Sequence, residues 1–273
     1  MQTRRPSALL GIRILCWFLL LPDISARNDT IPDLSKQTKA ADWLKLPNGK
    51  AVWVEMHDSA DESDEVVMHS DELESTRKRN PLSCVTPDFA GIVRKNAKTT
   101  PHRGCAKVFC TLDKLTKWLP TDSIMAQHQP RISSASDSKR VAEERRNVKV
   151  RRAYLLAAYR EQDNDFHVVL CDRPKYDPQS LLFSIEVSGL PKEGEVSRRA
   201  YRKLTKARNS LISRLGDIGC GKTFIIREGG IPVRVKGSLF FDSHHAGQIH
   251  GRQGLNPPSA WEIHPVTSFK WLD

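Results

Sequence analysis

Two short segments far apart in the chain share one pattern: Asp165-Phe166-His167-Val168-Val169-Leu170 and Trp261-Glu262-Ile263-His264-Pro265-Val266. Each places a carboxylate two residues before a histidine within an apolar run. Side chains at positions i and i+2 lie on the same face of a β-strand, so each segment predicts a strand that carries an acid and an imidazole on one face. If the fold brings the two strands together, the two pairs could converge on one site.

Other segments with the composition of strands surround this pair. Residues 148–159, 166–171 and 181–187 predict three consecutive strands, and residues 223–227, 233–239 and 259–269 predict the later ones. Between these groups, from 196 to 215, apolar residues recur at helical spacing, and many of the positions around them are basic. The apolar positions are Ala200, Leu204, Ala207, Leu211 and Leu215. This stretch therefore predicts one basic amphipathic helix.

Three strands, a helix and two or three further strands follow the order of an OB-type barrel, a closed five-stranded sheet with a helix after its third strand. The expected fold is mainly β: a small OB-like barrel with one inserted basic helix, over residues 139–273. Residues 27–138 are poor in apolar residues and rich in turn formers, apart from one half-buried strand at 50–56. They predict a loosely structured, poorly packed N-terminal region and linker.

The strand-rich half of the chain resembles a family of uncharacterised, mostly bacterial proteins that are often exported. The resemblance covers roughly residues 148–271. Its matching positions include Tyr154-Leu155, Asp165-x-His167, Asp172, Ile185-Glu186-Val187, the stretch from 233 to 245 and the closing Trp261-Glu262-Ile263-His264-Pro265-Val266. The resemblance implies a small OB-like β-domain, and it implies no settled activity.

Residues 1–26 have the pattern of a secretory signal peptide. Arg4, Arg5 and Arg13 precede an apolar run at 14–21, and Ala26 offers a small residue for cleavage. The run is far shorter than the ~20 residues of a membrane span. We therefore expect a secreted or cell-envelope protein with no stable transmembrane span after signal removal. An uncleaved anchor or a misassigned start is the alternative. Five cysteines follow residue 26, and an oxidising compartment would permit two disulfides and one free thiol.

The acid and imidazole pairs predict a metal site, because nitrogen and carboxylate donors together suit zinc or manganese. The candidate ligands are Asp165, His167, Glu262, His264, Asp242 and His245. Glu186 lies on the polar face of its strand and is the candidate catalytic residue, as a general base. A bound ion could acidify a water molecule and make the chain a metal-dependent, nuclease-like hydrolase. The same residues are also consistent with a polar network that fixes strand ends, or with contacts to a ligand.

The chain is strongly basic, with a formal net charge of +11 and an isoelectric point near 9.5. This charge favours a polyanionic partner, with nucleic acid as one candidate. The candidate polyanion-binding residues are Arg198, Arg199, Arg202, Lys203 and Lys206 on the predicted helix. An exported OB-like binding module with this basic face is the leading prediction. A metal-dependent hydrolase and a non-catalytic surface or partner-binding protein are the alternatives.

Residues 216–223, Gly-Asp-Ile-Gly-Cys-Gly-Lys-Thr, match the letter pattern of a phosphate-binding loop. That loop requires a strand before it and a helix after it, so that backbone N–H groups face the phosphates. Here the predicted helix comes first and a strand follows. The glycines therefore predict a connecting turn rather than a nucleotide site.

Overall fold

The computed structural model describes residues 86–216, 218–220, 222–226, 229–246 and 255–272, together with the backbone of two strands at 40–45 and 51–58. The predicted signal peptide, residues 1–26, lies outside the described residues. Among the helices that are described, none has the length and apolar character needed to cross a membrane.

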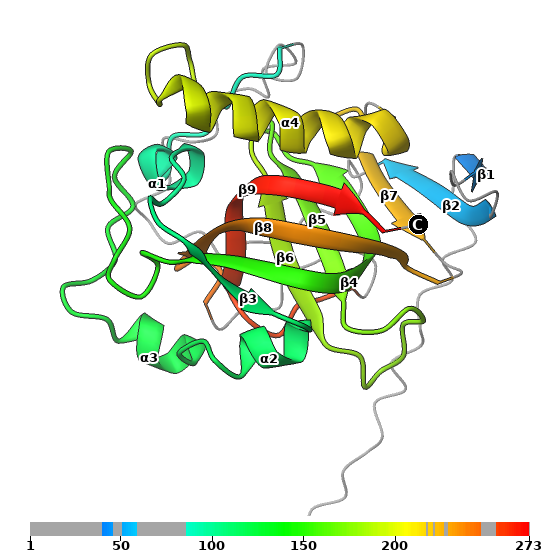
Figure 1. Cartoon of the computed structure of the whole chain (residues 1–273), viewed down its shortest axis with the longest axis horizontal. Helices are drawn as coiled ribbons and strands as arrows, with labels where there is room; N and C mark the ends of the chain where they lie inside the picture. The colour runs from blue at the N-terminus through cyan, green and yellow to red at the C-terminus, as the bar shows by residue number, and fades with distance from the viewer. Residues whose placement is uncertain are drawn as a thin grey trace, which may run out of the picture. The chain divides into compact units, whose positions relative to one another are not determined.

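Five strands form a closed barrel (Figure 1). They are β4 (Asn147–Arg160), β5 (Phe166–Cys171), β6 (Leu182–Val187), β8 (Ile231–Phe241) and β9 (Trp261–Trp271). The order around the barrel is β4-β5-β6-β9-β8, and β8 closes it by pairing with β4. Neighbouring strands are antiparallel except β6 and β9, which are parallel. With α4 (Arg198–Leu215) inserted after the third barrel strand, this is the OB-type order, and the predicted mainly β, OB-like barrel is confirmed.

β4 closes the barrel because it is long enough to pair with several strands at once. Its first half pairs with β8 and with the short parallel strand β3 (Ala106–Phe109), and its second half pairs with β5. Register shifts within β4 mark bulges, which bend a strand and increase its twist. Beyond the barrel, β7 (Lys222–Ile226) pairs with β4 and β2 (Ala51–Asp58), and β2 pairs with β1 (Ala40–Lys45).

The strands alternate between the barrel core and its outer face, as the period of two requires. Buried inward positions include Phe166, Val168 and Leu170 of β5, Phe183, Ile185 and Val187 of β6, and Trp261 and Ile263 of β9. The intervening positions point to the outside of the barrel. Along β5, β6 and β9 these outer positions carry most of the polar residues that the sequence marked as candidate ligands.

α4 packs its apolar stripe against the barrel beside β9 (Figure 1). Leu204, Ala207, Leu211 and Leu215 are buried, at the spacing predicted for the helix. The hydroxyl of Ser197 accepts a hydrogen bond from the backbone N–H of Ala200 at 3.2 Å and so caps the first turn. At the other end, the indole N–H of Trp271 donates to the carbonyl of Ser210 at 2.8 Å.

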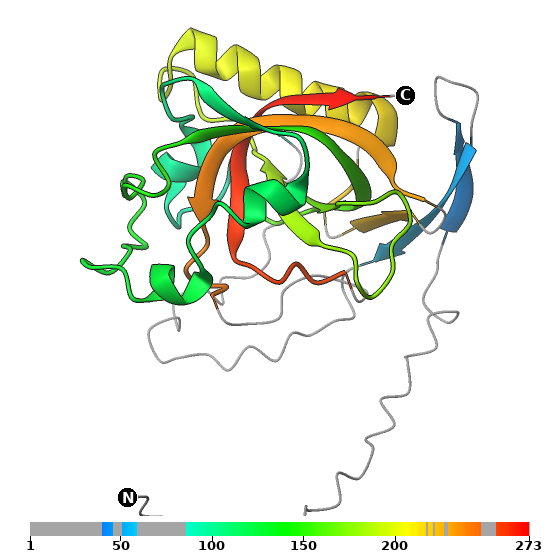
Figure 2. The same cartoon turned by 60° about the horizontal axis from the view of Figure 1, so that its bottom comes forward.

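Within the predicted N-terminal region, residues 86–138 pack against the barrel. This part forms α1 (Lys95–Thr99), β3, α2 (Leu112–Thr116) and α3 (Asp122–Ala126). Leu112, Leu115 and Met125 are buried in the same core as the barrel residues. In Figures 1 and 2, α2 and α3 lie on the side of the barrel opposite α4. The region contributes scattered apolar residues to the barrel core instead of building its own, so it lacks the periodic pattern that would reveal it.

Polar contacts anchor the same region to the barrel. The guanidinium of Arg94 donates to both carboxylate oxygens of Glu144, at 2.8 and 2.7 Å, and both side chains are buried. The carboxylate of Asp122 accepts from Ser259 and from the backbone of Ala260. These partners lie 50 to 138 residues away along the chain, so no local sequence pattern predicts the contacts.

Two smaller predictions concern the turn after α4 and the cysteines. The helix comes before the glycine-rich turn and β7 follows it, as predicted for a connecting turn. Among the described residues Cys220 is disulfide-bonded, whereas Cys105, Cys110 and Cys171 are free.

Candidate functional site

The outer face of β5, β6 and β9 carries a group of acids and histidines, which we call the acid–histidine cluster: Asp165, His167, Glu186, Glu262 and His264. Strand register brings them together. His167 and Glu186 are directly paired across β5 and β6, and Glu262 lies opposite Ser184 where β9 joins β6. Since β6 runs between the other two strands, Glu186 sits at the centre.

His264 has carboxylates beside both of its ring nitrogens. Its Nε2 lies 3.1 Å from Oδ2 of Asp165. Its Nδ1 lies 2.7 Å from Oε2 of Glu186 and 3.6 Å from Oε2 of Glu262. The imidazole is fully buried, and the Phe240 ring packs against it with centroids 5.3 Å apart.

His167 contacts the same central carboxylate from the other side. Its Nδ1 lies 3.5 Å from Oε1 of Glu186 and 3.8 Å from Oε1 of Glu161. Its Nε2 is 3.0 Å from the hydroxyl of Ser184, and its ring stacks on Tyr159 at 4.6 Å. Both histidines therefore flank Glu186, and the predicted convergence of the two segments is present in the fold.

The predicted partners within each segment need correction. Asp165 does not face His167. One of its oxygens accepts the backbone N–H of Gly189 at 2.6 Å, and the other lies beside His264. Glu262 and His264 are near each other, but the closest carboxylate to His264 is Glu186. Long-range strand pairing, which brings β6 between the two segments, overrides the local i, i+2 pairing.

Asp242 and His245 lie at the edge of the cluster, after β8. Nδ1 of His245 is 3.2 Å from Oδ2 of Asp242, and these two residues with Glu262 form a group whose donor atoms lie within 4.8 Å of one another. Asp165, Glu186 and His264 form a second such group, and Glu161, His167 and Glu186 form a third. The described residues thus contain clusters that could hold a metal ion, and every candidate ligand from the sequence belongs to one of them.

Residues 86–100, the covering segment, bury this face of the barrel. Phe89 donates its backbone N–H to Leu190, and Lys98 reaches Asp163, 3.9 Å away, at the rim of the cluster. As a result Asp165 and His264 are fully buried, and the side chains of Glu186 and Glu262 are 4% exposed. No polymer could reach these groups without displacing the covering segment.

Burial and mutual charge set the protonation of the cluster. Burial raises the pKa of Asp165, with a further contribution from Asp163, to about 7. Burial and the charge of Glu186 raise the pKa of Glu262 to about 8. Burial alone would lower the pKa of His264, but Glu186 and Asp165 hold it well above its usual range. Burial opposes ionisation of Glu186 as well, yet His264 and Lys98 keep its pKa well below the usual value. An ionised Glu186 beside a protonated His264 is therefore the centre of the cluster.

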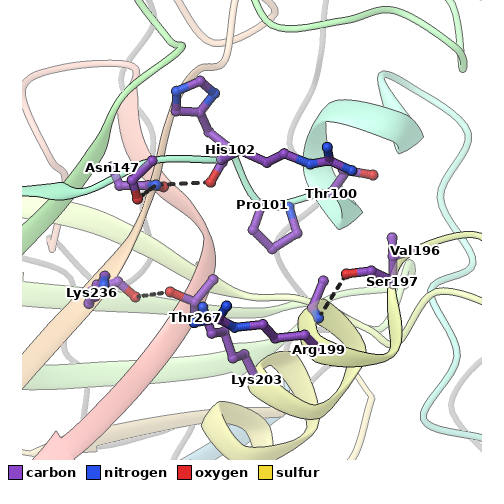
Figure 3. A pocket seen from close by; sticks show the side chains of 13 residues that line it. Thr100, Pro101, His102, Asn147, Val196, Ser197, Arg199, Lys203, Lys236 and Thr267 are labelled. Carbon is purple, nitrogen blue, oxygen red and sulfur yellow. Dashed lines mark hydrogen bonds between the residues drawn. The ribbon is translucent and has the colours of Figure 1, made fainter.

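A second candidate site is open to solvent. A cavity of about 440 Å³, the basic groove, lies between α4, the end of the covering segment and the outer face of β8 and β9 (Figure 3). Its cationic lining residues are Arg103, Arg199, Lys203 and Lys236. His102 also lines it, but burial and the charges of Arg140 and Arg145 lower its pKa. Among the residues that the structure describes, no Asp or Glu lines it. In Figure 3 the side chains of Arg199 and Lys203 extend from α4 toward Thr267 of β9, with Pro101 and His102 across from them.

The predicted polyanion-binding residues of α4 are all exposed: Arg198, Arg199, Arg202, Lys203 and Lys206. Only Arg199 and Lys203, one helical turn apart, line the groove. The other groove cations were missed at the sequence level. Lys236 alternates with the buried Val235 on β8, a pattern that indicates an outward side chain, but only the fold places it opposite α4.

No protein-family model, curated protein or solved structure matches this chain. The resemblance to uncharacterised exported proteins therefore stays a prediction, and the geometry of the cluster and of the groove carries the functional argument.

Proposed function

We propose that this chain is an exported OB-like binding module whose basic groove and adjoining α4 surface bind the phosphate groups of a nucleic acid. The observation that carries the proposal is the composition of the groove: cations from three separate parts of the fold line one cavity without a carboxylate among the described lining residues. A phosphodiester backbone is the polyanion that such a surface would track.

The cations of the groove repel one another, and a bound anion would relieve this repulsion. Burial lowers the pKa of Lys203, and the positive charges of Arg199 and Lys236 lower it further. Lys236 is also directly opposite Lys149 across β8 and β4. Like charges at paired positions destabilise a sheet unless a counter-charge lies between them.

The N-terminus of α4 adds to the positive potential. The helix has 18 residues and no acidic residue in its first turn, and its N-cap residue, Ser197, lines the groove. The aligned peptide dipoles place partial positive charge at this end, which favours anions.

Electrostatic contact, not base stacking, would dominate this binding. Among the described residues Tyr176 is the single aromatic side chain with a large exposed area, and it does not line the groove. Binding without stacking rings is expected to show little sequence preference and a strong dependence on salt.

Fluorescence anisotropy with a labelled single-stranded oligonucleotide, over a series of salt concentrations, tests the proposal. Arg199→Glu and Lys236→Glu should each weaken binding and reduce the slope of log affinity against log salt by about 0.7 per lost phosphate contact. Lys114→Glu, an exposed residue of α2 on the opposite side of the barrel, makes the same change in net charge and is the matched control. Equal losses in the control and the groove variants, or binding that is indifferent to salt, would refute the proposal.

The hydrolase alternative has less support, because the groups that would perform it are buried. His264 and Asp165 have no exposed side-chain surface, whereas the basic groove holds no acid among its described lining residues. A zinc or manganese ion in the cluster would therefore stabilise the fold and would not act on a polymer substrate. Metal-stimulated cleavage of DNA or RNA by the purified protein would reverse this choice.

A further inference from the structure

The central side chains of the acid–histidine cluster approach one another closely, but their contacts are not well-aligned hydrogen bonds. Neither ring nitrogen of His264 makes a hydrogen bond of acceptable geometry within the described residues, although carboxylate oxygens lie 2.7 and 3.1 Å away. The nearest oxygens, Oδ2 of Asp165 and Oε2 of Glu186, also have no hydrogen-bond partner there. Buried polar atoms are nearly always paired, so four such atoms in one place call for an explanation. Carboxylate oxygens held close to a buried imidazole without well-aligned hydrogen bonds are typical of ligands arranged around one cation.

We propose that Asp165, Glu186 and His264 bind a divalent transition-metal ion with the donor preference of zinc. Their donor atoms lie within 4.8 Å of one another. Bonds of ~2.0–2.2 Å around a tetrahedral ion separate the ligands by about 3–4 Å. Since Asp165 and Glu186 lie beside different ring nitrogens, a rotation of the imidazole that turns one nitrogen toward both carboxylates brings the three into place. The carboxylates of Asp165 and Glu186 would balance the charge of the ion, and binding would release the protons that Asp165 and His264 otherwise hold.

Neighbouring groups orient the three ligands. The backbone N–H of Gly189 holds the second oxygen of Asp165 at 2.6 Å, and Nδ1 of His167 lies 3.5 Å from the second oxygen of Glu186. Oε2 of Glu262 lies 3.6 Å from Nδ1 of His264. Such outer contacts set the orientation and basicity of metal ligands. Asp165 directly precedes β5, and Glu186 and His264 lie in β6 and β9. The ion would therefore tie these strands together on their outer face, a structural role independent of the polyanion proposal.

The full-length chain, unfolded in EDTA and refolded with ZnCl₂ or MnCl₂, provides the test. Elemental analysis should find one zinc per chain, and zinc should raise the melting temperature more than manganese does. Asp165→Asn should bind zinc at least tenfold more weakly, because the amide can keep the bond from Gly189 but not the metal bond. Asp172→Asn is the matched control: this carboxylate also accepts a backbone N–H, from Leu181 at 2.9 Å, but lies outside the cluster.

Three results would overturn the site. They are less than stoichiometric zinc in the wild type, equal zinc affinity in Asp165→Asn, and a thiolate charge-transfer band in the cobalt-substituted wild type, which would place the metal on cysteine. The cobalt spectrum needs no variant, so it decides the question even if Asp165→Asn does not fold. Asp165→Asn should leave the affinity for the oligonucleotide unchanged. This result would distinguish the metal-site proposal from the proposal that the basic groove binds nucleic acid.

Discussion

The buried ion pair between Arg94 and Glu144 should be the strongest single anchor of the covering segment. Glu144 is fully buried and accepts four hydrogen bonds: two from Arg94, one from the backbone of Phe241 at 2.9 Å and one from that of Val141 at 2.8 Å. Glu144→Gln keeps the shape of the side chain but leaves the Arg94 guanidinium buried without a counter-charge. Removing one partner of a buried pair costs about 3–5 kcal/mol.

Chemical and thermal unfolding of the full-length chain measure this cost. For a domain of this size the loss corresponds to a fall in melting temperature of roughly 6–20 °C. The matched control is Asp113→Asn, the same amide-for-acid change at an exposed pair with Lys117, whose side chains are 49% and 76% exposed. Exposed pairs contribute under about 1 kcal/mol, so the control should be close to wild type.

A second variant separates the unpaired charge from other effects of the substitution. Arg94→Met combined with Glu144→Gln removes both charges of the pair and also the repulsion between Arg94 and the buried Arg140, so it should recover part of the lost stability. If Glu144→Gln costs no more than Asp113→Asn, or if the double variant is less stable than the single one, the covering segment is not held to the barrel in the way described.

Two further predictions concern the packing of the barrel and the charge of the groove. Gly237→Ala should lower the melting temperature by the equivalent of about 1–3 kcal/mol, because the new Cβ would lie 2.5 Å from Cγ2 of Ile263. In the control variant, Gly219→Ala, the new Cβ would meet only a flexible side chain at 3.5 Å, so the melting temperature should change little. Similar melting temperatures for both variants would contradict the close approach of β8 and β9. Oligonucleotide binding should weaken as the pH rises through the lowered pKa of Lys203, because the protonated amine is the binding form. Lys203→Arg should keep its affinity for the oligonucleotide over the same pH range. An identical pH profile for both proteins would show that Lys203 does not contact the ligand.

The strands and the helix were predictable because local periodicity encodes them. The alternation of residues 233–239 and the helical spacing from Ala200 to Leu215 match β8 and α4 closely. The OB-type order followed from the sequence of these elements. The region before residue 139 was not predictable in the same way, because Leu112, Leu115 and Met125 fill a core that other segments build.

The candidate site was only partly predictable. Glu262 and His264 share a face of one strand, and Glu186 was correctly placed on the polar face of its own strand. The position of Glu186 between two histidines depends on β6 pairing with both β5 and β9. The partner of Asp165 was missed for the same reason, since His264 lies 99 residues further along the chain.

By itself, the sequence determined the strands and the helix, the side of each strand that is polar, and the basic surface of α4. These properties depend on backbone geometry and on side chains a few residues apart, so they can be recognised without the fold. Closure of the barrel decided the rest: which acid meets which histidine, that residues 86–100 bury them, and that Lys236 faces Arg199 across a cavity. Such contacts depend on strand register and packing between distant segments, which no local pattern specifies.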